Sequence, residues 1–273
     1  MLFFDKIRGA ILDEDPDPEV VLLRESALES VRSDPGLHQL VPYFVQFVAE
    51  KVTHSSNNTF VLRQMMELTS ATITNKSLFV DPYVSNIVAP ILTCLVGRNI
   101  GPGTPESLKS EFQLRDLAAS LLGQISIKYS ASSEQLRPRL ARTVLKYFLD
   151  PQRSLGEYYG AIAGLISVGG PEGIRSLVLP NIKSFEYVLT KAQNERGAAD
   201  QSLSMVIAIL VKAVTSITDT PAPFSNGTNG VVAAEAPLVE EFLGTIIGSR
   251  VNALSNRALC KAVLEAREQN LKP

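Results

Sequence analysis

Prolines recur along this chain at similar intervals, each at the point where an apolar, helix-like stretch begins. The prolines in this setting are Pro42, Pro82, Pro138, Pro180 and Pro237, which are separated by 40, 56, 42 and 57 residues. A proline in the first turn of a helix costs no hydrogen bond, because its missing N–H would have no partner there. A regular series of such helix starts indicates a repeated helical unit.

The two longer intervals each contain a loop insertion. Residues 97–110 carry three glycines and two prolines, and residues 219–236 are rich in Pro, Gly, Asn, Ser and Thr. Without about 14 and about 15 residues from these loops, every interval is close to the roughly 40–47 residues of a two-helix HEAT or armadillo unit. We therefore predict an all-α fold, an α-solenoid of about five HEAT repeats, each an antiparallel helix pair that buries its apolar face by stacking on its neighbours.

Apolar residues follow the helical period of 3.6, and nothing alternates convincingly as a strand. The clearest stripe lies in residues 203–217 and places branched side chains on one side of a helix, at Leu203, Val206, Ile207, Leu210, Val211, Val214 and Ile217. Two further stretches, residues 41–52 and 114–125, repeat the pattern. We expect a lead-in segment over residues 1–17, followed by one HEAT-repeat domain over residues 18–273.

Composition and charge exclude several classes of protein. Hydrophobic residues make up 45% of the chain and the formal net charge is −2, which favours a folded chain over a disordered one and argues against a generally basic nucleic-acid binder. Two cysteines, Cys94 and Cys260, cannot form a disulfide framework. We find no targeting segment, and the apolar run over residues 203–217 is interrupted by Lys212 and too short to span a bilayer. We expect an intracellular protein with no membrane contact.

Residues that carry chemistry are scarce. His38 and His54 are the two histidines, and neither has Cys, Asp or Glu at the spacing of metal ligands. No glycine-rich stretch fits a phosphate-binding loop. The acidic run over residues 13–17 resembles a calcium loop, but Pro18 and Arg24 replace the glycine and the glutamate that such a loop requires. The sequence predicts no enzyme, no metal site and no cofactor.

Two features are candidates for contact with a partner protein. Arg139, Arg142 and Lys146 fall within about 60° of one another on one helix. They indicate either a basic ridge for an acidic partner or nucleic acid, or an ordinary solvated helix face. The aromatic pair Tyr158 and Tyr159 indicates either an anchor for a partner or packing against the preceding repeat.

Several short sequence motifs occur in a fixed order along the chain. They are LFFDKI at 2–7, SDPGLHQLVPYF at 33–44, PILTCLV at 90–96, LRDLAA at 114–119, YGAIAGL at 159–165 and LVLP at 177–180. Over residues 2–190 the chain resembles the C-terminal HEAT domain of the family of transcription initiation factor TFIID subunit 6. Beyond Gly197 the resemblance is to a generic HEAT unit, and the loop at 219–236 departs from the family pattern.

The resemblance implies a non-enzymatic scaffold module in the nucleus. Proteins of this family are subunits of TFIID and, in fungi, also of SAGA, so the implied partners are other subunits of these complexes in RNA polymerase II transcription initiation. The histone fold that pairs with TFIID subunit 9 is implied for a region absent from this sequence. Contact between two copies of the HEAT domain stays open. Arg115 and Asp116 match a family motif, and the resemblance implies hydrogen bonds between repeats for them first and partner contact second.

Three functions remain as alternatives at this point. The first is the transcription scaffold, and the second is a HEAT-repeat interaction scaffold unrelated to transcription. The third is an enzyme, which would need a convergent nucleophile, base or metal set that the sequence does not provide. Contact with DNA through Arg139 and Arg142 is at most a minor addition.

Replacing Leu210 by Asp tests the helical stripe over residues 203–217. We expect Leu210→Asp to unfold the last repeat or to lower the free energy of unfolding by about 4 kcal/mol or more, because it buries an unpaired charge. The melting curve followed by circular dichroism measures this effect. A melting curve like that of the unsubstituted chain would mean that the stripe is not part of the core.

Overall fold

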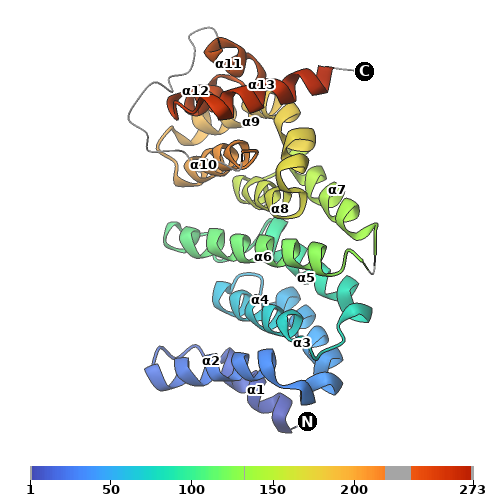
Figure 1. Ribbon diagram of the computed structural model, residues 1–273. Coiled ribbons are helices and arrows are strands. Elements are labelled where there is room, and N and C mark those ends of the chain that lie inside the picture. The colour runs from blue at the N-terminus through green and yellow to red at the C-terminus, as the bar shows by residue number, and fades with distance from the viewer. Residues whose placement is uncertain (1, 132, 219–234, 272–273) are drawn as a thin grey trace. The chain divides into compact units, whose positions relative to one another are not determined.

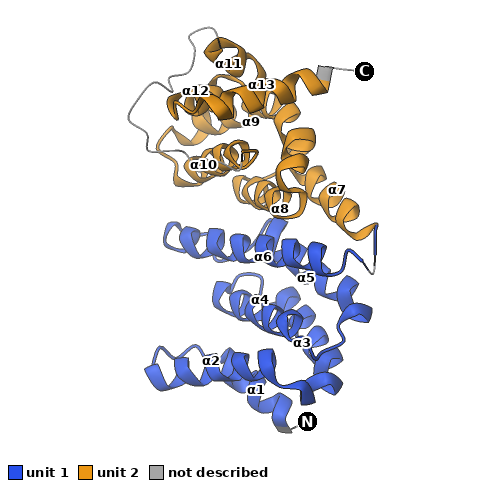
Figure 2. Cartoon of the chain, in the orientation of Figure 1, with its two compact units in different colours: residues 1–134 blue, residues 135–273 orange. Residues whose placement is uncertain are grey.

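The computed structural model describes residues 2–131, 133–218 and 235–271, and the regular structure in these ranges is helical throughout. The chain divides into two compact units, residues 1–134 and residues 135–273 (Figure 2). Unit 1 contains α1 (Leu2–Leu12), α2 (Pro18–Ser33), α3 (Val41–His54), α4 (Thr59–Thr74), α5 (Val84–Val96) and α6 (Leu108–Lys128). Unit 2 contains α7 (Leu136–Leu149), α8 (Leu155–Gly173), α9 (Leu179–Arg196), α10 (Gln201–Thr215), α11 (Ala236–Leu243), α12 (Thr245–Ala253) and α13 (Arg257–Leu271).

The repeated prolines mark helix starts, as the sequence predicts. Pro42, Pro180 and Pro237 lie in the first turns of α3, α9 and α11. Pro138 is the third residue of α7, and Pro82 lies in a single 3₁₀ turn, η2 (Asp81–Tyr83), that leads into α5. Each of these helices packs against a following helix, and the all-α fold of stacked helix pairs is confirmed.

Unit 1 is built from two layers of helices (Figure 1). Helix α4 packs between α2 and α6 in one layer, while α3 packs against α5 in the other. Helix α1 joins the second layer through Phe4, whose ring lies 6.1, 5.6 and 5.8 Å from the rings of Tyr43, Phe44 and Phe47. The expected lead-in segment, residues 1–17, is therefore helical over Leu2–Leu12 and packs as the partner of α2. The sequence analysis did not predict this helix.

The first expected loop insertion is shorter than predicted. The sequence predicts a loop over residues 97–110, but a 3₁₀ turn, η3 (Pro105–Ser107), leads directly into α6 at Leu108. The Glu111 carboxylate accepts hydrogen bonds from the Gly103 N–H at 3.1 Å and from the Ser107 hydroxyl at 2.6 Å, so the start of α6 is tied to the loop. Most of the second expected insertion, residues 219–234, lies outside the described residues.

Unit 2 is organised around α8, which packs against α7 and α10. Its small residues Gly160, Ala161, Ala163 and Gly164 are buried, which lets these neighbours approach closely. The helix is broken at Gly170, where φ is +61°, a backbone conformation that a side chain disfavours. A short π-helical turn, η4 (Ile174–Val178), then leads into α9.

By length and composition alone the helical stretch Leu155–Arg196 could span a membrane, since an 18-residue window within it has a mean hydropathy of 1.2. Core helices of folded domains meet the same criterion. Within this stretch the helix is broken at Gly170, and α8 packs between α7 and α10.

The apolar stripe of α10 forms part of the core of unit 2. Leu203, Val206, Leu210 and Val214 are fully or almost fully buried, and Ile217 is buried just beyond the end of the helix. The other two members of the stripe, Ile207 and Val211, are half-buried at its margin. The period of 3.6 therefore identifies the buried face of this helix correctly.

Asn75 joins the end of α4 to the end of α2 in unit 1. Its substitution tests how much this contact stabilises the packing of the two helices. Its side-chain amide donates to the Val31 carbonyl at 2.9 Å and to the Asp34 carbonyl at 3.0 Å, and the side chain is 2% exposed. We expect Asn75→Ala to lower the free energy of unfolding by about 2–3 kcal/mol, because both carbonyls lose their donor. Urea unfolding followed by circular dichroism measures the change.

Asn57, in the exposed turn between α3 and α4, provides the matched control. Asn57→Ala removes the same amide at a surface position, so its effect should stay within about 0.5 kcal/mol. Equal effects of the two substitutions would contradict the structural role of Asn75.

Candidate partner-binding surface

The predicted basic ridge lies on the exposed side of α7. Leu140, Val144 and Phe148 are buried at intervals of four residues, and they fix which side of the helix faces the core. Arg139, Arg142 and Lys146 therefore lie on the opposite side, and all three are exposed. Their side chains make no hydrogen bond or ion pair with the described residues, so their charges are available to a partner.

Two neighbouring cations, in contrast, serve the fold. The Arg137 guanidinium donates to the carbonyls of Val168 at 2.7 Å and Gly169 at 3.1 Å, directly before the break in α8 at Gly170. Arg153 is paired with Asp150 at 2.8 Å and with Glu157 at 3.1 Å. The free basic surface of α7 is thus limited to Arg139, Arg142 and Lys146, which we call the α7 ridge.

Arg115 and Asp116 are adjacent in α6 but lie in different environments. Arg115 is 3% exposed, and its guanidinium donates to the Leu95 carbonyl at 2.7 Å and to the Gly97 carbonyl at 2.9 Å. These carbonyls end α5, so Arg115 binds the two helices of one pair to each other. Asp116 is exposed and is the member of this motif that a partner can reach.

Tyr158 and Tyr159 both lie inside unit 2. The Tyr158 hydroxyl donates to the Asp150 carbonyl at 2.7 Å, and its ring packs edge-on against Phe185 at 4.8 Å. Burial raises the pKa of the Tyr158 phenol, so the hydroxyl keeps its proton and remains a donor at neutral pH. Tyr159 is 5% exposed. Both side chains therefore contribute to packing in this structure, and the exposed candidates for partner contact are the α7 ridge and Asp116.

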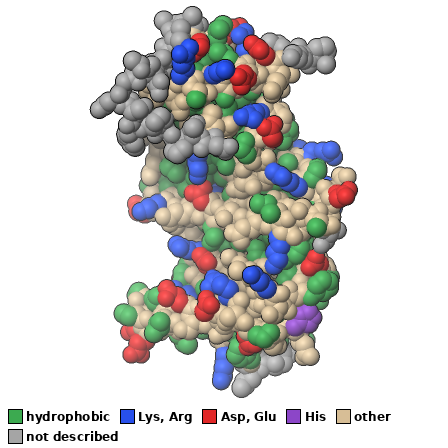
Figure 3. Space-filling model, in the orientation of Figure 1, with side chains coloured by type: hydrophobic (Ala, Val, Ile, Leu, Met, Phe, Trp, Pro, Cys, Tyr) green, Lys and Arg blue, Asp and Glu red, His purple; other side chains and the backbone are tan. Residues whose placement is uncertain are grey.

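The described residues offer little for catalysis or metal binding. Cys94 and Cys260 are buried free thiols, and burial raises the pKa of Cys94 to about 12, so this thiol is not a nucleophile at neutral pH. No group of three or more His, Cys, Asp or Glu gathers to hold a metal ion within the ranges that the structure describes. On the face in Figure 3, acidic and basic side chains are interspersed rather than gathered by sign.

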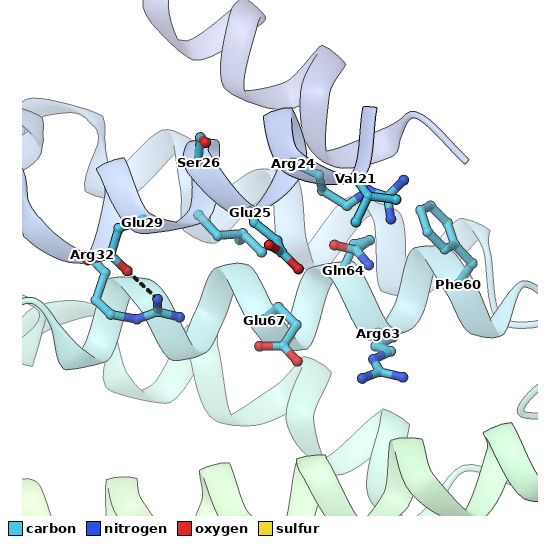
Figure 4. A pocket seen from close by; sticks show the side chains of 11 residues that line it. Val21, Arg24, Glu25, Ser26, Glu29, Arg32, Phe60, Arg63, Gln64 and Glu67 are labelled. Carbon is cyan, nitrogen blue, oxygen red and sulfur yellow. Dashed lines mark hydrogen bonds and ion pairs between the residues drawn. The ribbon is translucent and has the colours of Figure 1, made fainter. Parts of the chain in front are cut away.

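A second surface feature, which the sequence analysis missed, is a groove between α2 and α4 in unit 1 (Figure 4). It has a volume of about 700 Å³ and is lined by residues of these two helices. Its one signal in the sequence is Gln64, a polar residue that interrupts an apolar stripe containing Leu62, Met65 and Leu68. The sequence cannot show which helix faces Gln64, so the groove becomes visible only in the fold.

The comparisons with known proteins agree with the helical architecture. The sequence model described as the TAF6 C-terminal HEAT repeat domain matches residues 1–183. A solved structure, the TAF6 C-terminal domain from Antonospora locustae, is similar with a TM-score of 0.59 and 27% sequence identity, covering 77% of this chain and 94% of that one.

Curated relatives extend the similarity beyond residue 183. The Schizosaccharomyces pombe protein named SAGA complex/transcription factor TFIID complex subunit Taf6 is 36% identical over 266 residues, which are 97% of this chain and 56% of the relative. The Arabidopsis thaliana transcription initiation factor TFIID subunit 6 is 32% identical over 200 residues, which are 73% of this chain and 35% of the relative. The chain thus spans between about a third and just over half the length of these relatives. From the match over residues 1–183 and the stacked helix pairs, this chain belongs to the TAF6 C-terminal HEAT repeat domain family.

Proposed function

We propose that this chain is a non-enzymatic scaffold module of the general transcription factor TFIID, of SAGA, or of both. It acts in the nucleus, where it holds other subunits of these complexes together during initiation of RNA polymerase II transcription. The observation that carries this proposal is the similarity over 97% of the chain to a relative whose name places it in both complexes. A HEAT scaffold unrelated to transcription is disfavoured by the same similarity.

The physical character of the fold supports a scaffolding role. Stacked helix pairs expose long helical surfaces while their apolar faces are buried against one another, which suits them to bind extended partners. Family membership brings no catalytic residues with it, and the buried thiol of Cys94 offers no nucleophile. Such a module functions by binding other proteins, so its exposed side chains carry its function.

The α7 ridge is the surface that we assign to an acidic segment of another subunit. Its three cations share one side of a helix, and no carboxylate of the described residues neutralises them. Such a ridge attracts an acidic partner over a distance of about 10 Å at moderate salt and thereby raises the rate of association. Asp116 in unit 1 is a separate exposed contact of opposite charge.

Further partners follow from the family and are part of the same proposal. Pairing with TFIID subunit 9 is not assigned to any residue of this sequence, and self-association of two HEAT domains is an additional contact. Contact with DNA is a minor addition, because the chain is acidic overall with a net charge of −2.

Capture of partners from nuclear extract tests the scaffold proposal. We expect the tagged chain to recover subunits of TFIID or SAGA, identified by mass spectrometry, because the HEAT stack carries its own binding surfaces. The tag alone is the control. A reproducible set of unrelated partners would overturn the transcription role.

Charge reversal on the α7 ridge tests the assigned surface. We expect the triple variant Arg139→Glu, Arg142→Glu, Lys146→Glu to lose about 90% of the captured acidic subunit, because attraction becomes repulsion, with no large change in melting temperature. The triple variant Lys183→Glu, Lys191→Glu, Arg196→Glu on exposed positions of α9 carries the same change in charge and serves as the control. Equal losses in both variants would show that net charge, rather than the ridge, governs capture.

A further inference from the structure

A small apolar pocket lies in unit 2 where the end of α7 meets α9, and we call it the α7–α9 pocket. Phe148 and Leu149 of α7, Tyr158 of α8, and Phe185 and Tyr187 of α9 form most of its wall. Among the described residues, no Asp, Glu, Lys or Arg lines it. Its volume is about 110 Å³. A water molecule in the liquid takes up about 30 Å³, so the pocket has room for one branched side chain the size of leucine.

Two large apolar side chains at the rim of this pocket are exposed. Leu149 is 51% exposed and Tyr187 is 70% exposed, the highest value for a large hydrophobic side chain among the described residues. Behind them the buried rings of Phe148 and Phe185 pack at 5.0 Å. Exposed apolar side chains gathered around an apolar hollow are typical of a protein interaction site.

The carboxylates that neighbour the pocket in the sequence are already engaged. Asp150 and Glu157 share the Arg153 guanidinium, at 2.8 and 3.1 Å. The Glu186 carboxylate accepts from the Ile246 N–H at 2.7 Å. Helix α7 itself contains no Asp or Glu. The free charges that lead along α7 to the pocket are therefore the cations of the α7 ridge.

Leu149 continues the α7 ridge into this pocket. It follows Lys146 by three residues and Arg142 by seven, which places it about 60° and about 20° from them around the helix. At a rise of about 1.5 Å per residue, Lys146, Arg142 and Arg139 are about 4.5, about 10.5 and about 15 Å from it along the axis. One exposed side of α7 thus runs from three cations to an apolar hollow.

We propose that the α7 ridge and the α7–α9 pocket bind one extended acidic segment of a partner protein. A single leucine-sized side chain of the segment fills the pocket, and carboxylates on the same side of the segment pair with the ridge. Every second side chain of an extended chain points the same way, at intervals of about 6.6 Å. Carboxylates two and four residues from the apolar side chain therefore fall within the length of the ridge.

This inference rests on the proposed assignment of the ridge to an acidic segment and adds the anchor that fixes the segment in place. Exposed charges speed association but contribute little affinity, whereas an apolar side chain in a pocket contributes both affinity and register. A basic segment would meet the ridge as like charges. A segment without acidic residues would leave the ridge unpaired.

Fluorescence anisotropy with labelled peptides tests the proposal on the whole chain. The leucine probe is Glu-Ala-Glu-Ala-Leu-Ala-Glu-Ala-Glu, which reads the same in both directions, and the alanine probe has Ala in place of Leu. We expect the leucine probe to bind at least about tenfold more tightly, because only its central side chain fills the pocket. Rising salt should weaken both probes and leave the ratio of their affinities unchanged, since salt screens charges and not apolar burial.

Substitutions in the wall of the pocket locate the binding site. We expect Leu149→Ala to weaken the leucine probe about fivefold and to leave the alanine probe unchanged, because it removes apolar wall and no charge. Leu22→Ala, at a 64% exposed leucine on α2, is the matched control and should change neither affinity. Ser184→Phe, at an exposed position of the lining, should fill the pocket and remove the preference for leucine. All three positions are exposed, so the melting temperatures should stay close to that of the unsubstituted chain.

The outcomes separate this inference from the function on which it rests. Equal binding of the two probes, or an equal loss in Leu22→Ala, would overturn the anchor and leave the ridge assignment intact. Absence of binding by both probes at about 1 mM chain would overturn ridge and pocket together, while partner capture decides the scaffold role separately. Light scattering tests the other occupant, a second copy of this chain. A dimer that Leu149→Ala dissociates would overturn the assignment to a partner segment.

Discussion

The carbonyl groups at the ends of the helices are the constraint on which the stacking of this chain depends. The last carbonyls of a helix have no partner within it, and burying them unpaired costs about 1–3 kcal/mol each. A side chain from another element supplies the donor at five such ends: Asn75 to Val31, Lys128 to Ile73, Arg115 to Leu95 and Gly97, Arg137 to Val168 and Gly169, and Arg175 to Ile217. Most of these donors are cationic, which also suits the negative end of the helix dipole.

Because helix-end carbonyls need donors, not every basic side chain of this protein is available to a partner. A basic residue near a helix end can serve as a structural donor instead of a contact for a partner. Arg137 and Arg139 are two residues apart on α7, yet Arg137 holds the broken end of α8 and Arg139 is free. The distinction depends on whether an unpaired carbonyl lies within reach. Only the cations left after this assignment are free to recruit a partner.

The sequence predicts the periodic part of the fold well and the non-local part poorly. Proline spacing located the helix starts, and the period of 3.6 identified the buried side of α10, because both signals are local. Helix α1 was missed, since its short apolar stretch gains meaning only when Phe4 meets Tyr43, Phe44 and Phe47 of α3. The sequence does not decide between anchor and core for Tyr158, because its ring packs against Phe185 of α9, which is distant in the sequence.

The groove shows what remains when the structural donors and acceptors have been assigned. Elsewhere in unit 1, buried polar side chains such as Asn75 and Arg115 are satisfied by backbone carbonyls, and they hold helices together. Gln64 is buried to a similar degree, but its side-chain oxygen has no hydrogen-bond partner among the described residues. The buried face of α4 also contains Thr69 and Thr72, whose hydroxyls donate to the carbonyls of Met65 and Leu68, so Gln64 differs from them in that its oxygen has no partner among the described residues.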